Sequence, residues 1–262
     1  MPDLFGKTAL ITGASSGIGA AFAPFLASKG IKVILVARRE DRLEHLAEGI
    51  GKAGGWVRIL PADLAEEAGR LELFEAASKI GTVDILINNA GFGWYGFFHK
   101  MPWDLARQMA AVNIEAVAHL TSLFIPQMVA RGSGHVINIG SVAGSFPNQG
   151  IAMYAASKAF IDAFTTSLYR ELHGSGVTAS VMRLGPVKSE FYDLARNLEN
   201  GASIPAEKLA IGVEQVNRAL WRLLRHPRRV MYVPAWISII KFAEPLLGGI
   251  ADQLGPLLLK RL

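Results

Sequence analysis

Residues 8–19 read Thr8-Ala-Leu-Ile-Thr-Gly-Ala-Ser-Ser-Gly-Ile-Gly19, an apolar run that ends in a loop with three glycines. The run predicts a buried strand, and the residues after the loop have the apolar spacing of a helix. Glycine has no Cβ, so the backbone of the loop can turn sharply and approach a ligand closely. The first turn of the helix adds free N–H groups and the positive end of its dipole, which favour a phosphate. The stretch therefore predicts a strand, a phosphate-binding loop and a helix. Its spacing, G-x-x-x-G-x-G, differs from the G-x-G-x-x-G fingerprint, and a purely conformational glycine turn is the alternative.

The same alternation of strand and helix continues along the chain. Short runs rich in β-branched residues predict strands at residues 8–11, 32–37, 57–60, 85–88, 135–140, 178–184 and 230–233. Helical periodicity between them predicts helices at residues 17–29, 40–53, 66–80, 103–131, 151–173 and 206–225. The strands are nearly continuous in apolar residues, which indicates burial on both faces of a parallel sheet. We expect an α/β fold: one Rossmann-like, doubly wound domain over residues 1–235, with a seven-stranded parallel sheet and helices on both faces, followed by a hydrophobic and basic extension over residues 236–262.

The composition excludes several kinds of site. The chain has 262 residues, of which 51% are hydrophobic and 19% charged, with a formal charge of +5 and no cysteine. Without cysteine there are no disulfides, thiolate metal sites or cysteine nucleophile, and no metal site is expected. No secretory signal pattern precedes the first strand, and no run of about 18 uncharged apolar residues is present. We therefore expect a cytoplasmic protein.

The end of the second predicted strand indicates which nucleotide the chain prefers. The sequence there is Val36-Ala-Arg-Arg39, where a site for NAD has an acidic residue that holds the ribose 2′-hydroxyl. Two guanidinium groups suit a 2′-phosphate instead, because arginine binds phosphate through paired, charge-assisted hydrogen bonds. Arg38 and Arg39 therefore predict NADP(H), with Arg38 the stronger candidate. The alternative is a pair of arginines on the surface at the end of a strand.

A second group of polar residues follows the fifth predicted strand, which ends at Ser141. Thirteen residues later the next helix carries Tyr154-Ala-Ala-Ser-Lys158. Residues four apart lie on one helix face, so the ammonium comes near the phenol. A nearby positive charge favours phenolate and lowers the pKa of tyrosine. Tyr154 is thus a candidate proton donor and acceptor for a carbonyl or alcohol, and Ser141 a hydrogen-bond donor to the same oxygen. A lone Y-x-x-x-K pair is more often plain helix surface.

Together these motifs resemble the short-chain dehydrogenase/reductase family over nearly the whole chain. The resemblance implies a catalytic tetrad of Asn113, Ser141, Tyr154 and Lys158, with Lys158 also bonded to the nicotinamide ribose. It also implies a set of residues that contact the cofactor: Gly13, Ser15, Ser16, Gly17, Ile18, Gly19, Arg38, Arg39, Asp63, Leu64, Asn89, Ala90, Gly91, Tyr154, Lys158, Gly185, Val187 and Ser189. The chain departs from the family after the sixth strand, where Gly185-Pro186 stands in place of the usual Pro-Gly. This change is expected to affect the rigidity of the turn more than its contacts.

Aromatic residues follow strands four, five and six. Residues 92–98 read Phe-Gly-Trp-Tyr-Gly-Phe-Phe, Phe146 follows the fifth strand, and Phe191-Tyr192 comes after the sixth. They suit a mouth for a small hydrophobic carbonyl or alcohol substrate. Closure of the core or of an oligomer interface is the alternative.

The helices 103–131 and 151–173 carry more apolar residues than one buried face needs, and in the family these helices pair across a two-fold axis. We therefore expect a homodimer, or a homotetramer built from it. The residues taken as surplus are Ala110, Val117, Leu120, Phe124, Phe160, Phe164 and Leu168.

The extension 236–262 admits several partners. Basic residues from Arg218 onward and apolar patches would suit an anionic membrane or an acidic carrier protein. The tail would equally serve as a lid on the pocket or as a subunit contact. Glycines and prolines interrupt any long amphipathic helix, so we favour the lid over peripheral membrane contact. Nucleic-acid binding has no motif behind it.

These observations predict an NADP-dependent oxidoreductase that transfers a hydride between nicotinamide and the carbonyl or alcohol of a hydrophobic substrate. One alternative is a 3-oxoacyl reductase that acts on chains bound to an acyl carrier protein or to coenzyme A. A non-catalytic NADP-binding sensor or scaffold is the alternative from another class.

Overall fold

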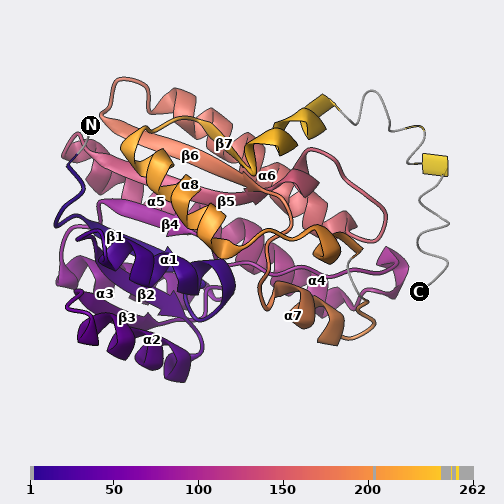
Figure 1. The fold of residues 1–262 in the computed structure, drawn as a ribbon, viewed down its shortest axis with the longest axis horizontal. Helices are drawn as coiled ribbons and strands as arrows, with labels where there is room; N and C mark the ends of the chain where they lie inside the picture. Colours follow the sequence, from indigo (N-terminus) through magenta and orange to yellow (C-terminus); the bar gives the residue numbers. More distant parts are fainter. Residues whose placement is uncertain (1–2, 203–204, 243–248, 250–251, 254–262) are drawn as a thin grey trace.

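The computed structural model describes residues 3–202, 205–242, 249, 252 and 253. Its centre is a seven-stranded, all-parallel sheet in the order β3-β2-β1-β4-β5-β6-β7 (Figure 1). The strands are β1 (Thr8–Thr12), β2 (Lys32–Ala37), β3 (Val57–Pro61), β4 (Ile85–Asn88), β5 (Gly134–Ser141), β6 (Val177–Leu184) and β7 (Val230–Val233). The order reverses between β1 and β4, and a crevice forms at the carboxyl ends of the strands at such a point.

Helices cover both faces of the sheet (Figure 1). One layer contains α1 (Gly17–Ala27), α2 (Glu40–Lys52) and α8 (Val213–Arg225), and the other contains α3 (Glu67–Ile80), α5 (Ala116–Ala130) and α6 (Ala152–Glu171). Shorter elements lie at or near the carboxyl ends of the strands: η1 (Phe98–Lys100), α4 (Trp103–Ala110), η2 (Ala111–Glu115), η3 (Val142–Gly144), α7 (Phe191–Asn197), η4 (Pro205–Leu209) and η5 (Ala235–Phe242).

The apolar strands pack against both helical layers, which explains their lack of alternating polarity. All four residues of β4 are buried, and so are five of the six residues of β2. One core cluster joins the sheet to α1 and α8, and a second joins it to α3 and α5. The predicted doubly wound fold with seven parallel strands is therefore confirmed.

Two of the predicted helices differ from the observed ones. The stretch predicted as one helix over 103–131 consists of α4, a π-helical turn and α5. A π-turn inserts one extra residue into the helix and often lies at a functional site. The helix predicted over 206–225 begins only at Val213, after Gly212 in extended conformation and the 3₁₀ turn η4.

The continuous helical stretch Trp103–Ala130 is long and apolar enough to cross a membrane by length and composition. In the fold, its second half packs against β4, β5 and α3 and buries Leu120, Phe124 and Met128. Core helices of soluble proteins meet the same criterion of length and hydropathy.

The predicted extension 236–262 lies mostly outside the described residues. Its first part forms η5, which contacts β7 and η3. The boundary at residue 235 stays a prediction.

Candidate active site

A cavity of about 750 Å³ opens at the carboxyl ends of the strands. Its walls come from the loops after β1, β2, β3, β4, β5 and β6, as expected for a ligand site in a doubly wound sheet. Every site residue predicted from the sequence lines this cavity except Gly19 and Asn113.

The glycine loop after β1 is shaped by contacts that leave no room for side chains. Gly13 and Gly17 have φ of +66° and +55°, in the left-handed region that favours glycine. A Cβ on Gly13 would lie 2.8 Å from the Cα of Ala90, and one on Gly19 would lie 2.4 Å from the carbonyl oxygen of Gly13. Gly19 thus acts behind the cavity wall by allowing the loop to close on itself. This geometry fits a loop that holds a pyrophosphate against the start of α1.

The loop after β4 is tied to the glycine loop by hydrogen bonds. The side-chain amide of Asn89 donates to the carbonyl oxygen of Thr12 at 2.9 Å, and the Thr12 hydroxyl accepts from the backbone N–H groups of Asn89 and Ala90 at 3.0 Å. These bonds fix the two loops relative to each other across the point where the strand order reverses.

Both predicted arginines line the cavity at the end of β2. The Arg38 side chain is 71% exposed and lies 3.7 Å from Asp63. Arg39 is more enclosed: its Nε donates to the hydroxyl of Ser15 at 3.2 Å, and its Nη1 donates to Glu190 at 3.3 Å. Two guanidinium groups therefore lie beside the glycine loop, where they fit a phosphate on the ribose.

Two further residues at this end were not found from the sequence. Glu190 follows β6 and receives hydrogen bonds of 2.7 and 2.8 Å from Arg42 on α2. Arg42 also holds the pKa of Glu190 below its ordinary value. Glu190 is about 150 residues away in the chain from Arg39 and Arg42, so no local pattern indicates these contacts.

Three of the four predicted tetrad residues, Ser141, Tyr154 and Lys158, line the cavity. The hydroxyl of Tyr154 interacts with the Ser141 side chain, which acts to lower the pKa of the phenol. The Lys158 ammonium lies 5.7 Å from the centroid of the Tyr154 ring and donates to the carbonyl oxygen of Ile139 at 2.9 Å. Tyrosine, serine and lysine therefore meet at one point of the wall.

Asn113 lies behind this group, in the π-turn. Its amide nitrogen donates to the carbonyl oxygen of Phe92 at 2.9 Å and to the Ser157 hydroxyl at 3.1 Å, and its oxygen accepts from the N–H of Phe92 at 3.1 Å. A Cβ on Gly91 would lie 3.0 Å from this oxygen and 3.7 Å from the Lys158 nitrogen. Asn113 thus fixes the loop after β4 next to the lysine.

Burial changes the proton affinities of the central pair. It raises the pKa of Tyr154 to about 12, which the hydrogen bond from Ser141 only partly opposes. Burial also lowers the pKa of Lys158 to about 8, and the charge of Asp162 acts in the opposite direction. The expected lowering of the pKa of Tyr154 is therefore wrong, because desolvation of the phenolate is the dominant effect on this group.

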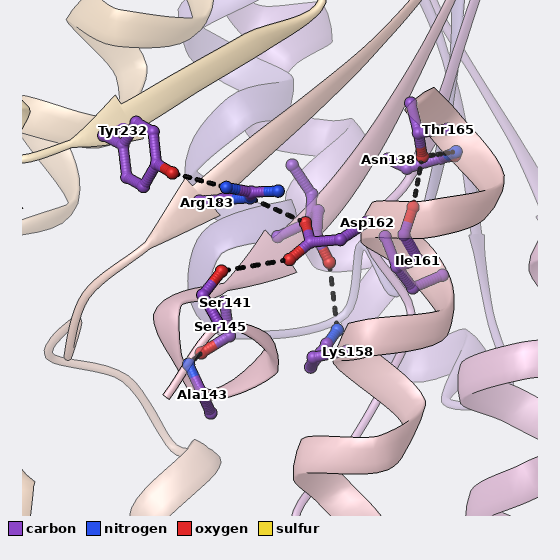
Figure 2. A network of polar contacts seen from close by, with 11 residues as sticks. Asn138, Ser141, Ala143, Ser145, Lys158, Ile161, Asp162, Thr165, Arg183 and Tyr232 are labelled. Atoms are coloured by element: carbon purple, nitrogen blue, oxygen red, sulfur yellow. Dashed lines mark hydrogen bonds and ion pairs between the residues drawn. The ribbon is translucent and has the colours of Figure 1, made fainter. Parts of the chain in front are cut away.

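A polar network behind Lys158 was also missed. The Asp162 carboxylate, one turn after Lys158 on α6, forms an ion pair of 2.9 Å with Arg183 of β6. Figure 2 shows the network continuing from Arg183 to Tyr232 and from Asp162 to Ser145. The charged Arg183 inside a largely buried strand is a local signal for it.

Aromatic and aliphatic side chains form the wall opposite the glycine loop. Phe92, Trp94, Phe146 and Phe191 line the cavity, and the ring of Phe191 lies 5.5 Å from that of Tyr154. The aromatic residues of the segment 92–98 do not all have the same place. Phe92 and Trp94 line the pocket, whereas Phe98 faces solvent and Tyr95 is buried outside the lining.

The first residues of the extension, Trp236 and Ile237, line the cavity as well. Ile237 is only 4% exposed, and Trp236 is 70% exposed. The described start of the extension therefore contributes to the wall of the pocket.

No cluster of three or more His, Asp or Glu side chains suited to a metal occurs in the described part of the chain.

A family model described as short chain dehydrogenase matches residues 7–200. The chain belongs to the short-chain dehydrogenase/reductase family. It is therefore an oxidoreductase by family.

Relatives of known sequence agree with this membership. A short chain dehydrogenase of Pseudocercospora fijiensis is 40% identical over 191 residues, which cover 72% of this chain and 62% of that protein. The chain thus spans less than two thirds of that relative's length. The 3-oxoacyl-[acyl-carrier-protein] reductase FabG of Salmonella typhimurium is 34% identical over 82% of this chain and 88% of its own.

Solved structures of short-chain dehydrogenases have the same architecture. One from Sphingobium yanoikuyae in complex with NADPH is 30% identical, with a TM-score of 0.81 over 95% of this chain and 94% of its own. One from Burkholderia phymatum in complex with NAD is 27% identical, with a TM-score of 0.84 over 94% and 95%. The solved structures that resemble this chain therefore include complexes with either nucleotide.

Proposed function

We propose that this dehydrogenase uses NADP(H) to interconvert a carbonyl and an alcohol on a small hydrophobic substrate, with Tyr154 as the proton donor and acceptor. The observation that carries the proposal is that Tyr154 and Ser141 line the wall of one cavity together with the glycine loop. A substrate oxygen placed between these two hydroxyls would receive a hydrogen bond from each.

The residues present fit the nucleotide in its extended form. Glycines whose Cβ atoms would clash line one end of the cavity, and the residues around Lys158 line the other. Gly13, Ser15, Ser16, Gly17 and Ile18 would hold the pyrophosphate. The adenine would lie against Asp63 and Leu64 and the nicotinamide against Ala90, Gly91, Gly185, Val187 and Ser189. Bound NADPH supplies the hydride.

The protein side chains would carry the proton and position the oxygen. Ser141 would hold the carbonyl oxygen, and the neutral phenol of Tyr154 would give it a proton. Lys158 would hold the ribose hydroxyls with its ammonium, and Asn113 would keep the loop beside it in place. A phenol whose pKa is about 12 is protonated at neutral pH, which suits the donation step in the direction of reduction.

Arg38 and Arg39 support NADP(H) over NAD(H). Both line the cavity beside the glycine loop, at the end of β2, where a site for NAD has an acidic residue. Arginine binds phosphate through charge-assisted bonds. The NADPH complex of the Sphingobium yanoikuyae enzyme agrees with this preference.

The apolar wall supports a hydrophobic substrate. Phe92, Phe146 and Phe191 stand around the point where the substrate oxygen would bind, and few polar side chains are available there for the several hydroxyls of a sugar. A 3-oxoacyl thioester is the second candidate, because the FabG reductase is 34% identical over most of both chains.

NADPH consumption with a panel of carbonyl compounds tests the proposal. The panel contains aromatic and aliphatic ketones, a 3-oxoacyl thioester and a keto sugar. We expect turnover with one of the first three classes, and a loss of about 10²–10⁴-fold in kcat for Tyr154→Phe with NADPH affinity nearly unchanged.

Tyr169→Phe is the matched control, since Tyr169 lies on the same helix outside the cavity lining. Turnover of the Tyr154→Phe protein equal to that of the control would end the assignment of Tyr154. NADPH binding without turnover of any compound would favour the sensor instead.

A further inference from the structure

An ion pair lies directly behind the candidate active site. Asp162 is one helical turn beyond Lys158 on α6, so both side chains lie on the same face of that helix. Its carboxylate is 9% exposed and accepts a hydrogen bond of 2.9 Å from the Nε of Arg183, whose side chain is 17% exposed. Buried charges of this kind are costly unless they are paired.

The pair is held from several elements (Figure 2). The Ser145 hydroxyl, just after η3, approaches the second carboxylate oxygen at 3.5 Å. The guanidinium of Arg183 donates to the hydroxyl of Tyr232 on β7 and lies 5.3 Å from the centroid of its ring. The network therefore connects α6, which carries Lys158, with β6, β7 and the turn that follows Ser141.

Few charges face Lys158. Burial favours loss of its proton, and Asp162 is the neighbour that opposes this loss. The other ionisable groups around the pair are Tyr154 on α6, Arg183 on β6, Tyr232 on β7, and Tyr192 on α7, which interacts with Tyr154. Asp162 is thus a carboxylate whose charge acts on two cations, Lys158 and Arg183.

We propose that Asp162 is a positioning residue of this site: held in place by Arg183, it keeps its negative charge one helical turn from Lys158 and so keeps the proton on that buried ammonium. The proposal rests on the proposed function, because the ammonium matters only if Lys158 holds the nucleotide ribose and acts beside Tyr154. Without the carboxylate, the positive charge of Arg183 would no longer be paired in this network, and a nearby like charge favours the neutral amine.

The test is Asp162→Asn, which keeps the shape and leaves an oxygen to accept from Arg183. NADPH affinity is measured by fluorescence titration between pH 6 and 10, and kcat/KM over the same range. We expect wild-type affinity to fall on the alkaline side as Lys158 loses its proton. In the variant this fall should begin about one pH unit lower, the size typical of a removed neighbouring charge. Above both midpoints, affinity should be about tenfold lower than in the wild type.

Two further variants separate this role from a structural one. Tyr232→Phe removes a hydrogen bond of the network without changing its charge. It should lower stability, while the fall in NADPH affinity at alkaline pH should occur at the same pH as in the wild type. Arg183→Gln removes the cation beside an ionised Asp162 and should move the fall to higher pH, opposite to Asp162→Asn. A purely structural role predicts losses in all three variants with no opposite shifts.

Each outcome decides a different point. If neither Asp162→Asn nor Arg183→Gln moves the fall, or both move it the same way, the proposal is overturned. If Asp162→Asn does not fold, Arg183→Gln decides alone: a shift to lower pH or none overturns the proposal. If the wild type binds NADPH with no alkaline fall, the proposal also fails. If the shifts appear in binding but no carbonyl is turned over, the proposed reaction fails while the role of Asp162 in binding stands.

Discussion

Tyr154 and Lys158 illustrate how burial and charge compete at single residues. Both lose hydration in the cavity wall, and this favours neutral phenol and neutral amine together. Burial alone therefore gives the phenol the state needed for proton donation but works against the ammonium needed beside the ribose. The carboxylate of Asp162 acts on the second problem, because its charge opposes loss of the proton from Lys158.

The arginines after β2 carry the prediction on nucleotide choice. The double change Arg38→Ala, Arg39→Ala removes the charge-assisted bonds to a 2′-phosphate, each worth about 1.5–3 kcal/mol. We expect the ratio of kcat/KM for NADPH to that for NADH to fall by at least tenfold, measured with one substrate at one ionic strength. Arg58→Ala with Arg107→Ala is the control, since both arginines are exposed and lie outside the cavity lining. An unchanged ratio would mean that the phosphate is held elsewhere, for example by Ser15 and Ser16.

The residues found from the sequence and those missed differ in the range of their contacts. Tyr154 and Lys158 share one helix face, and the glycine loop is continuous in sequence, so spacing alone indicates what they do. Asp162 and Glu190 owe their importance to Arg183 and Arg42, which reach them from other elements. Sequence spacing carries no information about such tertiary partners.

At the scale of elements, most strands were placed within one or two residues because buried parallel strands are short apolar runs. The π-turn at residues 111–115 was not foreseen. It places Asn113 so that its amide pairs with the backbone of Phe92, and this pairing depends on the loop after β4. A π-turn of five residues leaves the apolar spacing of the helix largely intact, so the sequence predicts a uniform α-helix.

The amino ends of β5, β6 and β7 are joined by a buried histidine, which leads to a prediction on acid stability. His135 on β5 lies 2.8 Å from the Ser180 hydroxyl on β6, which donates to the carbonyl oxygen of Arg228 just before β7. Burial lowers the pKa of His135 from its ordinary 6.5 to about 4. Between about pH 6.5 and pH 4, the unfolded chain binds a proton at this histidine, whereas the folded chain does not. The contribution of His135 to the free energy of unfolding is therefore complete above about pH 6.5 and is lost towards pH 4, by about 3 kcal/mol at most.

Urea unfolding at pH 7, 5.5 and 4.5 measures this effect. The difference in free energy of unfolding between pH 7 and 4.5 should be smaller in His135→Gln than in the wild type. His173→Gln, at an exposed position after α6, should leave the difference as it is. Parallel curves for the wild type and His135→Gln would show that another group causes the acid loss.

At the scale of the whole molecule, the expected surplus of apolar side chains on two helices needs correction. Val117, Leu120 and Phe124 are 5% exposed or less within the single chain, because they pack under the sheet. The apolar surface that remains on the two helices includes Phe160 and Phe164, which are half-buried with rings stacked 5.5 Å apart. Helical periodicity shows that a helix has apolar residues around much of its circumference. It does not show which of these residues pack against the sheet and which remain on the surface.

The remaining apolar surface still predicts self-association, now through fewer residues. A contact across a two-fold axis would bring the stacked Phe160 and Phe164 of one protomer against those of its partner, where burial of apolar area favours association. Sedimentation of the wild type at micromolar concentration should give two or four times the chain mass of 28.2 kDa. Phe160→Glu places a charge in this contact and should shift the protein to the monomer. Phe5→Glu, at a 79% exposed site before β1, should leave the assembly intact. A wild type that sediments only as a monomer, or a Phe160→Glu protein that assembles like the wild type, would place the interface elsewhere or remove it.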